Sequence, residues 1–377
     1  MTEAPASTGA NLRLARQTRG FSQQQLASMA GVSRQAVSAV ESGHSDPSLR
    51  VALALAQALG LSVEELFGPG EPALPVTAIS AAPLHGKTAR VALAPIGDRF
   101  VALPLRGDTG AGLGFLPAGG LANPPNFAVS AVAAGPAEAG LELIAVRPIG
   151  PPRPTLVVAG CDPALPLLAT PLALLDPPVA FAWWPCGSAA ALRLASLGLV
   201  HAAGVHTQGD NGENGLPLPD GADVVGFTAW REGLAVRPDL KSAVTGLGAI
   251  ARHHLRIVNR EPGAEARRLL DAERRRLGLD PSDLPGYDTQ AAGHLQVASA
   301  VAAGLAAAGV ASEPAARAYG LAFVPLAEER FNLVIPAEHA ASREVQALLR
   351  VLSSPWLLAQ LASLPGYDAA TCGDRLT

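Results

Sequence analysis

The sequence predicts a multidomain protein with an all-α head, a small β-rich middle unit and an α/β part that forms one domain or two lobes. Apolar residues recur at helical spacing up to Phe67, and the Pro- and Gly-rich stretch GPGEPALP at 68–75 then interrupts them. Short apolar runs broken by Gly, Pro and Asn follow, at roughly the 8–12-residue spacing of an all-β unit. Beyond Thr155, strand-like and helix-like runs alternate, which is typical of an α/β domain. We therefore expect domains at 9–67, 76–149 and 155–368.

The head contains two helices at the spacing of a helix-turn-helix, in residues 22–43, SQQQLASMAGVSRQAVSAVESG. The small Ala27 lets the two helices approach each other, and Gly31 lies where the turn needs a residue without Cβ. Ser22 and Ser33 stand where N-caps are expected. The segment therefore predicts two short helices that cross at a tight turn.

The second of these helices has one apolar and one polar face. Val37 and Val40 fall on the face directed into the core. Arg34, Gln35 and Ser38 fall together on the opposite face. We expect these three side chains to face the major groove of DNA; the alternative is an ordinary helical bundle with a solvated polar face.

Residues 9–67 resemble the lambda-repressor/Cro-type (XRE) helix-turn-helix domain. Five segments fit its template of short helices: LRLARQTRG, SQQQLASMAG, SRQAVSAVESG, PSLRVALALAQALG and SVEELFG. In that family the Gln that opens the second helix holds a phosphate, which the resemblance implies for Gln23. It implies base contacts for Arg34, Gln35 and Ser38, and phosphate or sugar contacts for Ser33 and His44.

The head carries no net charge. Residues 1–70 contain five basic and five acidic side chains, Arg13, Arg16, Arg19, Arg34 and Arg50 against Glu3, Glu41, Asp46, Glu64 and Glu65. One neutral head attracts phosphates weakly, so affinity would have to come from two copies. We expect a homodimer on a near-palindromic, double-stranded operator.

The middle unit, 76–149, contains five runs that predict strands of a small barrel or sandwich: ARVALAPIG, RFVALPL, GLGFLPAG, FAVSAVAAG and LELIAVRPI. No residue in it indicates a chemistry. GPPRP at 150–154 predicts a second linker.

The C-terminal part predicts a mostly parallel sheet, or two such lobes. Buried strands are expected at TLVVAG, VAFAWWP, ADVVGFTAW and LRIVNR, a long helix at AAGHLQVASAVAAGLA, short strands at LAFVPL and FNLVIP, and closing helices in SREVQALLRVLSSPWLLAQLASL. Open α/β sheets bind ligands beyond the carboxyl ends of their strands, where helix N-termini present free N–H groups. Two such turns stand out, Gly160-Cys161-Asp162 and Cys186-Gly187-Ser188. They favour an anionic ligand.

Residues 155–368 resemble the type 2 periplasmic-binding-protein-like family, which is related to molybdate- and tungstate-binding proteins. The resemblance is carried by GCDPALPLL, HAAGVHT, NREPGAEARRLLD, GHLQVASAVAAGLAAAGVA, ERFNLVIP and LPGYD. It implies an oxyanion ligand at the two turns, with Cys161, Gly187 and Ser188 as direct contacts; Asp162 and Cys186 stand in the same two turns, and we expect them at the ligand as well. Asn259 and Arg260 join from the NREPG turn, where a guanidinium can pair bidentately with an oxyanion, and His294 joins from the following helix.

This chain departs from that family in two ways. Ala264, Glu265 and Ala266 stand where the family has a Gly/Ser/Thr-rich turn suited to wrapping a tetraoxyanion. Cys186 would share the cleft with Cys161, and two thiols can ligate a soft metal or respond to redox.

The spacing of the three cysteines predicts neither a disulfide framework nor a zinc ribbon. We treat His201 with His206, and His253 with His254, as surface or core histidines, since neither pair has the i, i+4 spacing of helical ligands.

These observations together predict a ligand-responsive transcription regulator. No apolar run of about 18 residues is free of Pro, Gly and charge, so we expect a cytoplasmic protein without a membrane partner. We expect no enzymatic activity, because Ser188 does not stand in a GxSxG elbow. We also expect no cofactor beyond a bound oxyanion. The alternatives are a soft-metal or thiol-redox sensor at Cys161 and Cys186, and a C-terminal part that serves only as a dimerisation platform.

Overall fold

The structure is a computed structural model that describes residues 8–67, 75–80, 82, 84, 88–106, 113–123, 142–207 and 217–376. It divides the chain into two compact units, Met1–Leu74 and Pro75–Thr377. The predicted boundary between the middle unit and the α/β domain falls inside the second unit. The strand predicted at FAVSAVAAG and most of the first linker lie outside the described residues.

The first unit contains the five helices that the sequence predicts: α1 (Thr8–Thr18), α2 (Gln23–Ala30), α3 (Arg34–Glu41), α4 (Leu49–Leu59) and α5 (Val63–Phe67). Ser22 caps α2 by accepting the Gln25 N–H, while the Gln25 side chain accepts the Ser22 N–H. Gly31 ends α2 with φ at 64°, a left-handed conformation that favours glycine. The helices enclose a core built around Leu12, Leu26, Val37, Leu55 and Leu59.

The second unit begins with a closed barrel of five strands in the order β1-β3-β2-β4-β5. The strands are β1 (Val76–Ser80), β2 (Ala89–Ile96), β3 (Arg99–Pro104), β4 (Gly120–Asn123) and β5 (Glu142–Pro148). The prediction of a strand at GLGFLPAG is wrong, because its described part forms a 3-10 turn at Leu113–Phe115. Strand β4 begins one residue later, at Gly120. The preceding Gly119 packs so closely against β2 that a Cβ atom at this position would lie 2.8 Å from the Leu93 backbone nitrogen.

The α/β part is built on one continuous sheet in the order β11-β10-β12-β9-β13-β8-β6-β7, with β14 and β15 paired to β9. Its strands are β6 (Thr155–Ala159), β7 (Ala180–Trp184), β8 (Ala202–Thr207), β9 (Asp223–Val236), β10 (Ile257–Arg260), β11 (Gln290–Ala291), β12 (Ala308–Ser312), β13 (Ala322–Ile335), β14 (Tyr367–Asp368) and β15 (Arg375–Leu376). The sheet is mixed rather than mostly parallel. Parallel strands at its two ends flank the antiparallel pair β9 and β13.

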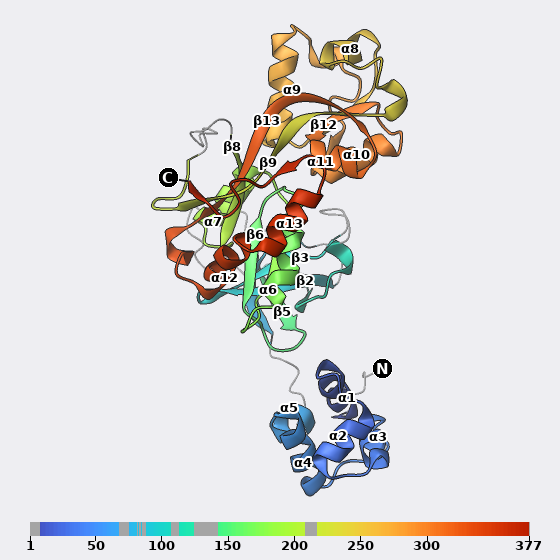
Figure 1. Ribbon diagram of the computed structural model, residues 1–377, viewed down its shortest axis with the longest axis vertical. Coiled ribbons are helices and arrows are strands. Elements are labelled where there is room, and N and C mark those ends of the chain that lie inside the picture. The colour runs from blue at the N-terminus through green and yellow to red at the C-terminus, as the bar shows by residue number, and fades with distance from the viewer. Residues whose placement is uncertain are drawn as a thin grey trace. The chain divides into compact units, whose positions relative to one another are not determined.

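Strands β9 and β13 run through both lobes and connect them (Figure 1). Lobe one packs α6 (Ala169–Ala173), α7 (Ser188–Ser196), α12 (Arg343–Leu352) and α13 (Pro355–Ser363) around β6, β7 and β8. Lobe two packs α8 (Leu247–Arg252), α9 (Glu265–Arg276), α10 (His294–Ala302) and α11 (Glu313–Ala318) around β10, β11 and β12. The cleft between the lobes is therefore bordered by the middle of two long strands.

Two predicted elements have different lengths in the structure. LAFVPL and FNLVIP are not two strands but the two ends of one strand, β13. This strand pairs with β9 along its length, and the pairing shifts register between Pro325 and Ala327 and between Phe331 and Asn332. The long helix predicted at 291–306 is reduced to α10, because Gly293 and Gly304 flank it with φ at 117° and 75°. Helical propensity alone does not predict where α10 begins and ends.

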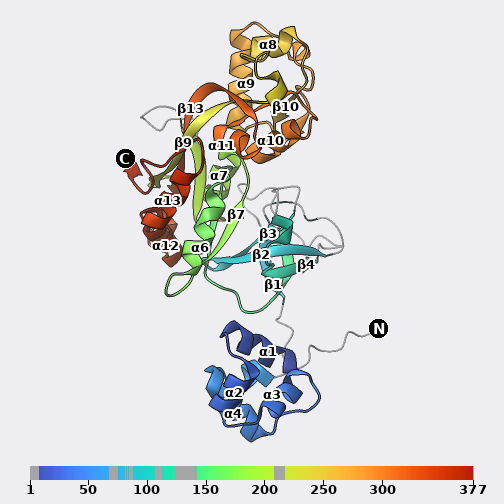
Figure 2. The same cartoon turned by 45° about the vertical axis from the view of Figure 1, so that its right-hand side comes forward.

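Strand β6 joins two cores through the alternation of its side chains. Leu156 and Val158 pack in a cluster with α12 and α13, while Val157 and Ala159 pack in a second cluster with α7. The barrel contributes to the second cluster through β2 and β3 side chains, including Ile96. The barrel and the pair α12 and α13 accordingly lie on opposite sides of lobe one (Figure 2).

Candidate functional site

The polar face predicted for the second helix is exposed in the structure. Ser33 caps α3, where its Oγ accepts the Ala36 N–H at 3.1 Å. Val37 and Val40 are buried, while Arg34, Gln35 and Ser38 are exposed on the other side of the helix. The structure thus brings the three predicted base-reading side chains onto one accessible surface of the first unit.

The other predicted DNA contacts lie near this surface and differ in burial and in hydrogen bonding. Gln23 is half-buried, and its Nε2 donates to Glu41 Oε2 at 2.9 Å, so its amide already has an intramolecular partner. His44 is exposed and its Nδ1 lies 2.7 Å from Ser42 Oγ. The phosphate roles of Gln23, Ser33 and His44 stay predictions.

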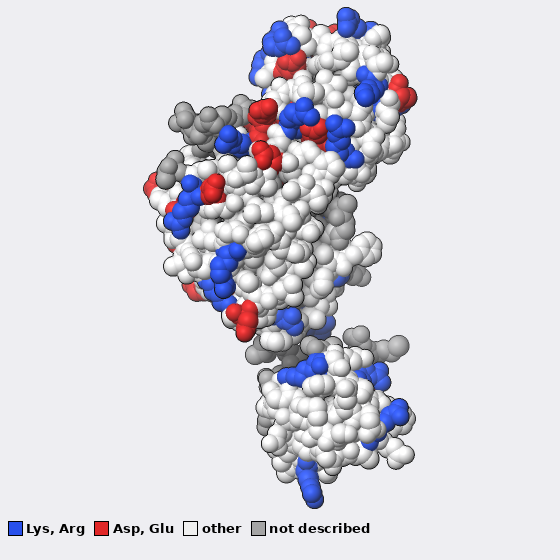
Figure 3. Space-filling view, viewed as in Figure 1, with Lys and Arg blue, Asp and Glu red and all other residues white. Residues whose placement is uncertain are grey.

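The neutral charge count of the head conceals an uneven surface. Glu41 is buried, and its carboxylate accepts two hydrogen bonds from the Arg16 guanidinium at 2.6 and 3.0 Å. Burial alone would raise the pKa of Glu41, but the hydrogen bonds from Arg16 and Gln23 outweigh it and lower the pKa. The face of the head shown in Figure 3 carries basic side chains and no acidic ones among the described residues. This distribution suits a polyanionic partner.

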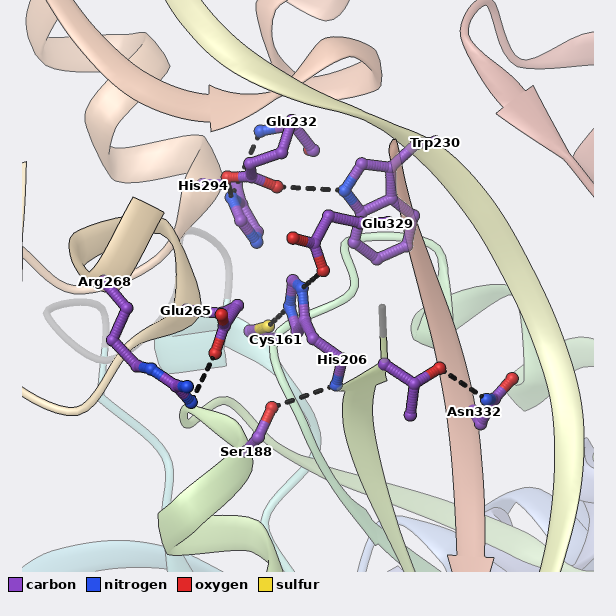
Figure 4. A network of polar contacts seen from close by, with 12 residues as sticks. Cys161, Ser188, His206, Trp230, Glu232, Glu265, Arg268, His294, Glu329 and Asn332 are labelled. Carbon is purple, nitrogen blue, oxygen red and sulfur yellow. Dashed lines mark hydrogen bonds and ion pairs between the residues drawn. The ribbon is translucent and has the colours of Figure 1, made fainter. Parts of the chain in front are cut away.

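The second candidate site lies in the second unit, in the cleft between the lobes (Figure 4). Cys161 follows β6 and His206 stands near the end of β8, so both belong to lobe one. His294 is the first residue of α10 in lobe two. Glu232 on β9 and Glu329 on β13 reach the same place from the connecting strands. All five residues are buried.

The side chain of His206 is the centre of this network. Its Nε2 lies 2.9 Å from Cys161 Sγ, and its Nδ1 lies 3.4 Å from Glu329 Oε2. The His206 backbone N–H donates to Ser188 Oγ at 3.0 Å. Burial alone would lower the pKa of His206, but the neighbouring Cys161 and Glu329 raise it well above its usual range.

His294 has an equivalent environment in the other lobe. Its Nδ1 accepts the Ser312 N–H at 3.2 Å and lies 3.4 Å from Glu232 Oε1. Its Nε2 is buried and has no hydrogen-bond partner among the residues that the structure describes. Burial, assisted by the charge of Arg260, lowers the pKa of His294 well below its usual range, and burial raises the pKa of Glu232 to about 7.

Four of the eight predicted ligand residues line a cavity of about 50 Å³ beside this network: Cys161, Cys186, Arg260 and His294. The two turns that the sequence singled out therefore open toward one place. Burial and the nearby Cys161 raise the pKa of the Cys186 thiol. The Arg260 guanidinium is 2% exposed and already pairs with the Glu261 carboxylate through contacts of 2.8 and 2.9 Å.

The other four predicted residues support the turns and do not line the cavity. Asp162 is buried and accepts hydrogen bonds from Thr228, Tyr367 and the Ala164 N–H. Ser188 holds the His206 backbone, and Gly187 is the N-cap of α7. The Asn259 side chain donates to the Tyr287 carbonyl and accepts the Arg260 N–H.

Sequence reasoning missed His206, Glu232 and Glu329 as site residues. The sequence pattern pairs His206 with the nearby His201, whereas its contacts are with Cys161, 45 residues away, and with Glu329. One signal was available: HAAGVHT places His206 near the carboxyl end of a buried strand, at the edge of the sheet where the Cys161 turn also lies. Glu232 and Glu329 reach the site because β9 and β13 pair along their length. The local sequence pattern does not predict this pairing.

His201 belongs to the core of lobe one, and we expect it to make stability depend on pH. Its Nδ1 accepts the Val157 N–H at 3.1 Å, and burial lowers its pKa to about 4. The unfolded chain, with an ordinary histidine pKa of about 6.5, binds the proton first, so stability falls as pH drops from about 6.5 to 4, by up to about 1.4 kcal/mol per pH unit. Unfolding followed by tryptophan fluorescence at pH 7 and pH 5 measures this loss, since every tryptophan lies in the second unit.

His201→Asn keeps an acceptor for the Val157 N–H but does not titrate, so its difference in unfolding free energy between pH 7 and pH 5 should be smaller than that of the parent. The exposed His253→Asn is the control and should behave like the parent. An identical pH profile for His201→Asn and the parent would show that His201 does not contribute.

Comparison with known proteins agrees with this division. Residues 12–66 match the helix-turn-helix family and residues 169–353 match the PBP superfamily domain. A Methanocaldococcus jannaschii relative, the uncharacterized HTH-type transcriptional regulator MJ0272, is 39% identical over 56 residues, which are 15% of this chain and 85% of that protein.

Two bacterial relatives match other lengths of the chain. The uncharacterized protein YvgK of Bacillus subtilis is 32% identical over 143 residues, 38% of this chain, and the match spans only 46% of YvgK. An uncharacterized protein in the 5′ region of a ferredoxin 2Fe-2S gene of Clostridium pasteurianum is 36% identical over 110 residues, 29% of this chain and 97% of that protein. Within the described residues, the structure contains no helix long and apolar enough to cross a membrane.

Proposed function

The chain belongs to the XRE-type helix-turn-helix proteins and carries a PBP superfamily domain, and we therefore propose that it is a ligand-responsive transcription regulator. One observation carries the proposal: exposed polar side chains of α3, Arg34, Gln35 and Ser38, in one unit coexist with a buried polar cleft between two lobes in the other. Lobe closure is a two-state element, and a ligand that prefers the closed state biases it. A coupling of about 1–3 kcal/mol is typical of such regulators.

We propose further that the protein acts as a homodimer on a near-palindromic operator. Selection of bound fragments from a random DNA library by the full-length protein tests this. The expected result is an enriched site with two related half-sites about one helical turn apart, and light scattering should give twice the chain mass for the protein on that site. Enrichment of no sequence would contradict DNA reading, and a single half-site bound by a monomer would contradict the dimer.

The proposed role of the cleft is binding rather than catalysis. Cys161, His206 and Glu329 stand in the order of a nucleophile, a base and a carboxylate. The adjoining cavity of about 50 Å³ is far smaller than the roughly 300–1,000 Å³ of pockets that hold organic substrates. The hydroxyl of Ser188, the other candidate nucleophile, already accepts a backbone N–H. A small ion or molecule therefore suits the site better than a substrate with a scissile bond.

The charge of the cleft argues against a molybdate- or tungstate-like effector, although the resemblance implies one. Arg260 supports an anion, but its guanidinium is occupied by Glu261. Glu232 and Glu329 add two more buried carboxyl groups, which repel an oxyanion in their ionised forms, Glu232 only in part because its pKa is about 7; His206, whose pKa is raised, opposes them with one positive charge. A thermal-shift panel of molybdate, tungstate, sulfate, metal ions and small organic acids on the full-length protein separates these classes. A response to none of them would favour a dimerisation platform.

A further inference from the structure

Three buried side chains in the cleft have the chemistry of transition-metal ligands. The donor atoms of Cys161, His206 and His294 all lie within 4.8 Å of one another, and the three residues are 8%, 2% and 1% exposed. Thiolate and imidazole are the donors that zinc and its neighbours in the first transition row prefer. In the part of the chain that the structure describes, no other group of three such donors meets in this way.

The spacing of the donors is close to that of a tetrahedral site. Zinc–sulfur bonds of about 2.3 Å and zinc–nitrogen bonds of about 2.0–2.1 Å place neighbouring ligand atoms about 3.5 Å apart. Cys161 Sγ and His206 Nε2, at 2.9 Å, would move apart slightly, and the separations of up to 4.8 Å would shorten by about 1 Å. Since His294 comes from lobe two, a small closure of the lobes supplies that movement.

Each histidine also has a carboxylate on the side away from the cluster. Glu329 Oε2 lies 3.4 Å from His206 Nδ1, and Glu232 Oε1 lies 3.4 Å from His294 Nδ1. Metal-binding histidines commonly donate their second ring N–H to a carboxylate in this manner, which fixes the tautomer and the ring orientation. The same pairing occurs twice here, on two different strands and toward one centre (Figure 4).

The proton of His294 must change position for this arrangement to form. Because Nδ1 accepts the Ser312 N–H, neutral His294 carries its proton on Nε2, the atom without a hydrogen-bond partner among the described residues. Ligation through Nε2 moves the proton to Nδ1, where Glu232 Oε1 can accept it. That carboxyl oxygen is itself buried and has no hydrogen-bond partner in the described part of the chain. The contacts of Nδ1 to the Ser312 amide and to Arg260 Nη1, which lies 3.4 Å away, are then given up.

We propose that Cys161, His206 and His294 bind a divalent transition-metal ion, with zinc as the first candidate and a fourth position left to water or a small anion. Cys161, as the thiolate, and His206, through a deprotonated Nε2, hold the ion on lobe one, and the protons that these two groups carry are released to solvent. His294 holds the ion on lobe two, so binding closes the cleft. This assigns an effector to the proposed function and rests on it for the regulatory consequence. Cys186 lines the neighbouring cavity but does not belong to the three-ligand cluster.

Titration of metal-free, full-length protein with Co²⁺ tests the site, because cobalt reports its ligands by absorption. The expected result is one ion per chain, visible d–d bands of four-coordinate cobalt and a thiolate-to-cobalt charge-transfer band, all displaced by Zn²⁺. Cys161→Ser should lose the charge-transfer band, and Cys186→Ser should retain it. Glu232→Gln should bind about 10–100-fold more weakly, and His294→Gln at least as much more weakly.

The wild-type protein alone can overturn the proposal, so the test does not depend on the folding of any variant. Absence of stoichiometric cobalt binding, or a cobalt spectrum without thiolate, would overturn it, and so would loss of the band in Cys186→Ser with its retention in Cys161→Ser. Operator binding is measured in parallel on the same samples. Intact operator binding without metal binding removes only this site, whereas absence of operator binding removes the proposed function whatever the cobalt result.

Discussion

Arg34→Ala is expected to lower specific operator affinity by about 5- to 150-fold, equivalent to roughly 1–3 kcal/mol, and to relax the preference for one base pair in each half-site. Arg34 is exposed on α3, so its removal leaves the core of the head intact. Gln35→Ala should have an effect of the same order at a neighbouring base pair. Fluorescence anisotropy with the selected operator and with single-base-pair variants, at moderate salt, measures both affinity and specificity.

Arg19→Ala is the matched control, because it removes an exposed guanidinium of the same head that lies outside α3. Any weakening it causes should be similar for all DNA sequences and should decrease the salt dependence. If Arg34→Ala behaved like Arg19→Ala, with equal losses on operator and non-operator DNA, Arg34 would be a phosphate contact and not a base reader.

Glu41→Ala is expected to destabilise the head by about 1–3 kcal/mol, because it leaves the half-buried Arg16 guanidinium without the carboxylate that accepts two of its hydrogen bonds. The tryptophans of the chain all lie in the second unit, so hydrogen exchange of peptides from residues 8–67 is the suitable measurement. Exchange there should accelerate strongly while peptides from the second unit keep their rates.

The exposed Asp46→Asn removes a negative charge from the same head without touching a buried partner, and its exchange should match that of the parent. The double variant Arg16→Met, Glu41→Leu should recover much of the loss, since apolar replacement of a whole buried pair is often neutral or better. Parent-like protection in Glu41→Ala would mean that the pair contributes little to the stability of the head.

The sequence predicted those parts of the fold that depend on local pattern. Capping serines, the left-handed Gly31 and the apolar face of α3 are each determined within a few residues, and the structure confirms the helices that they predict. The sequence predicts two strands in place of β13, because Pro325 and the charged stretch around Glu328 resemble a break, whereas pairing with β9 continues the strand through this stretch. Long-range pairing outweighed local propensity there.

The cleft was predicted only in part, for a related reason. The turns at Cys161 and Cys186 follow directly from the rule that ligands gather at the carboxyl ends of strands, and both line the cavity. Arg260 also lines the cavity, but the sequence does not predict its pairing with the adjacent Glu261. His206, Glu232 and Glu329 come together because of the pairing register and the length of the strands that carry them. No single segment of the sequence specifies these two properties.

The hydrophobic cluster shared by the barrel and lobe one has a mechanical consequence. Ile96 and Val101 of the barrel pack in the same close-packed interior as Val157 and Ala203 of the lobe. Close-packed interiors are stiff and transmit displacement, so the barrel and lobe one move together as one piece. A movement of lobe one relative to lobe two would then displace the barrel by the same rigid-body motion. Substitutions that loosen this cluster should therefore weaken the response to an effector while leaving its affinity for the cleft unchanged.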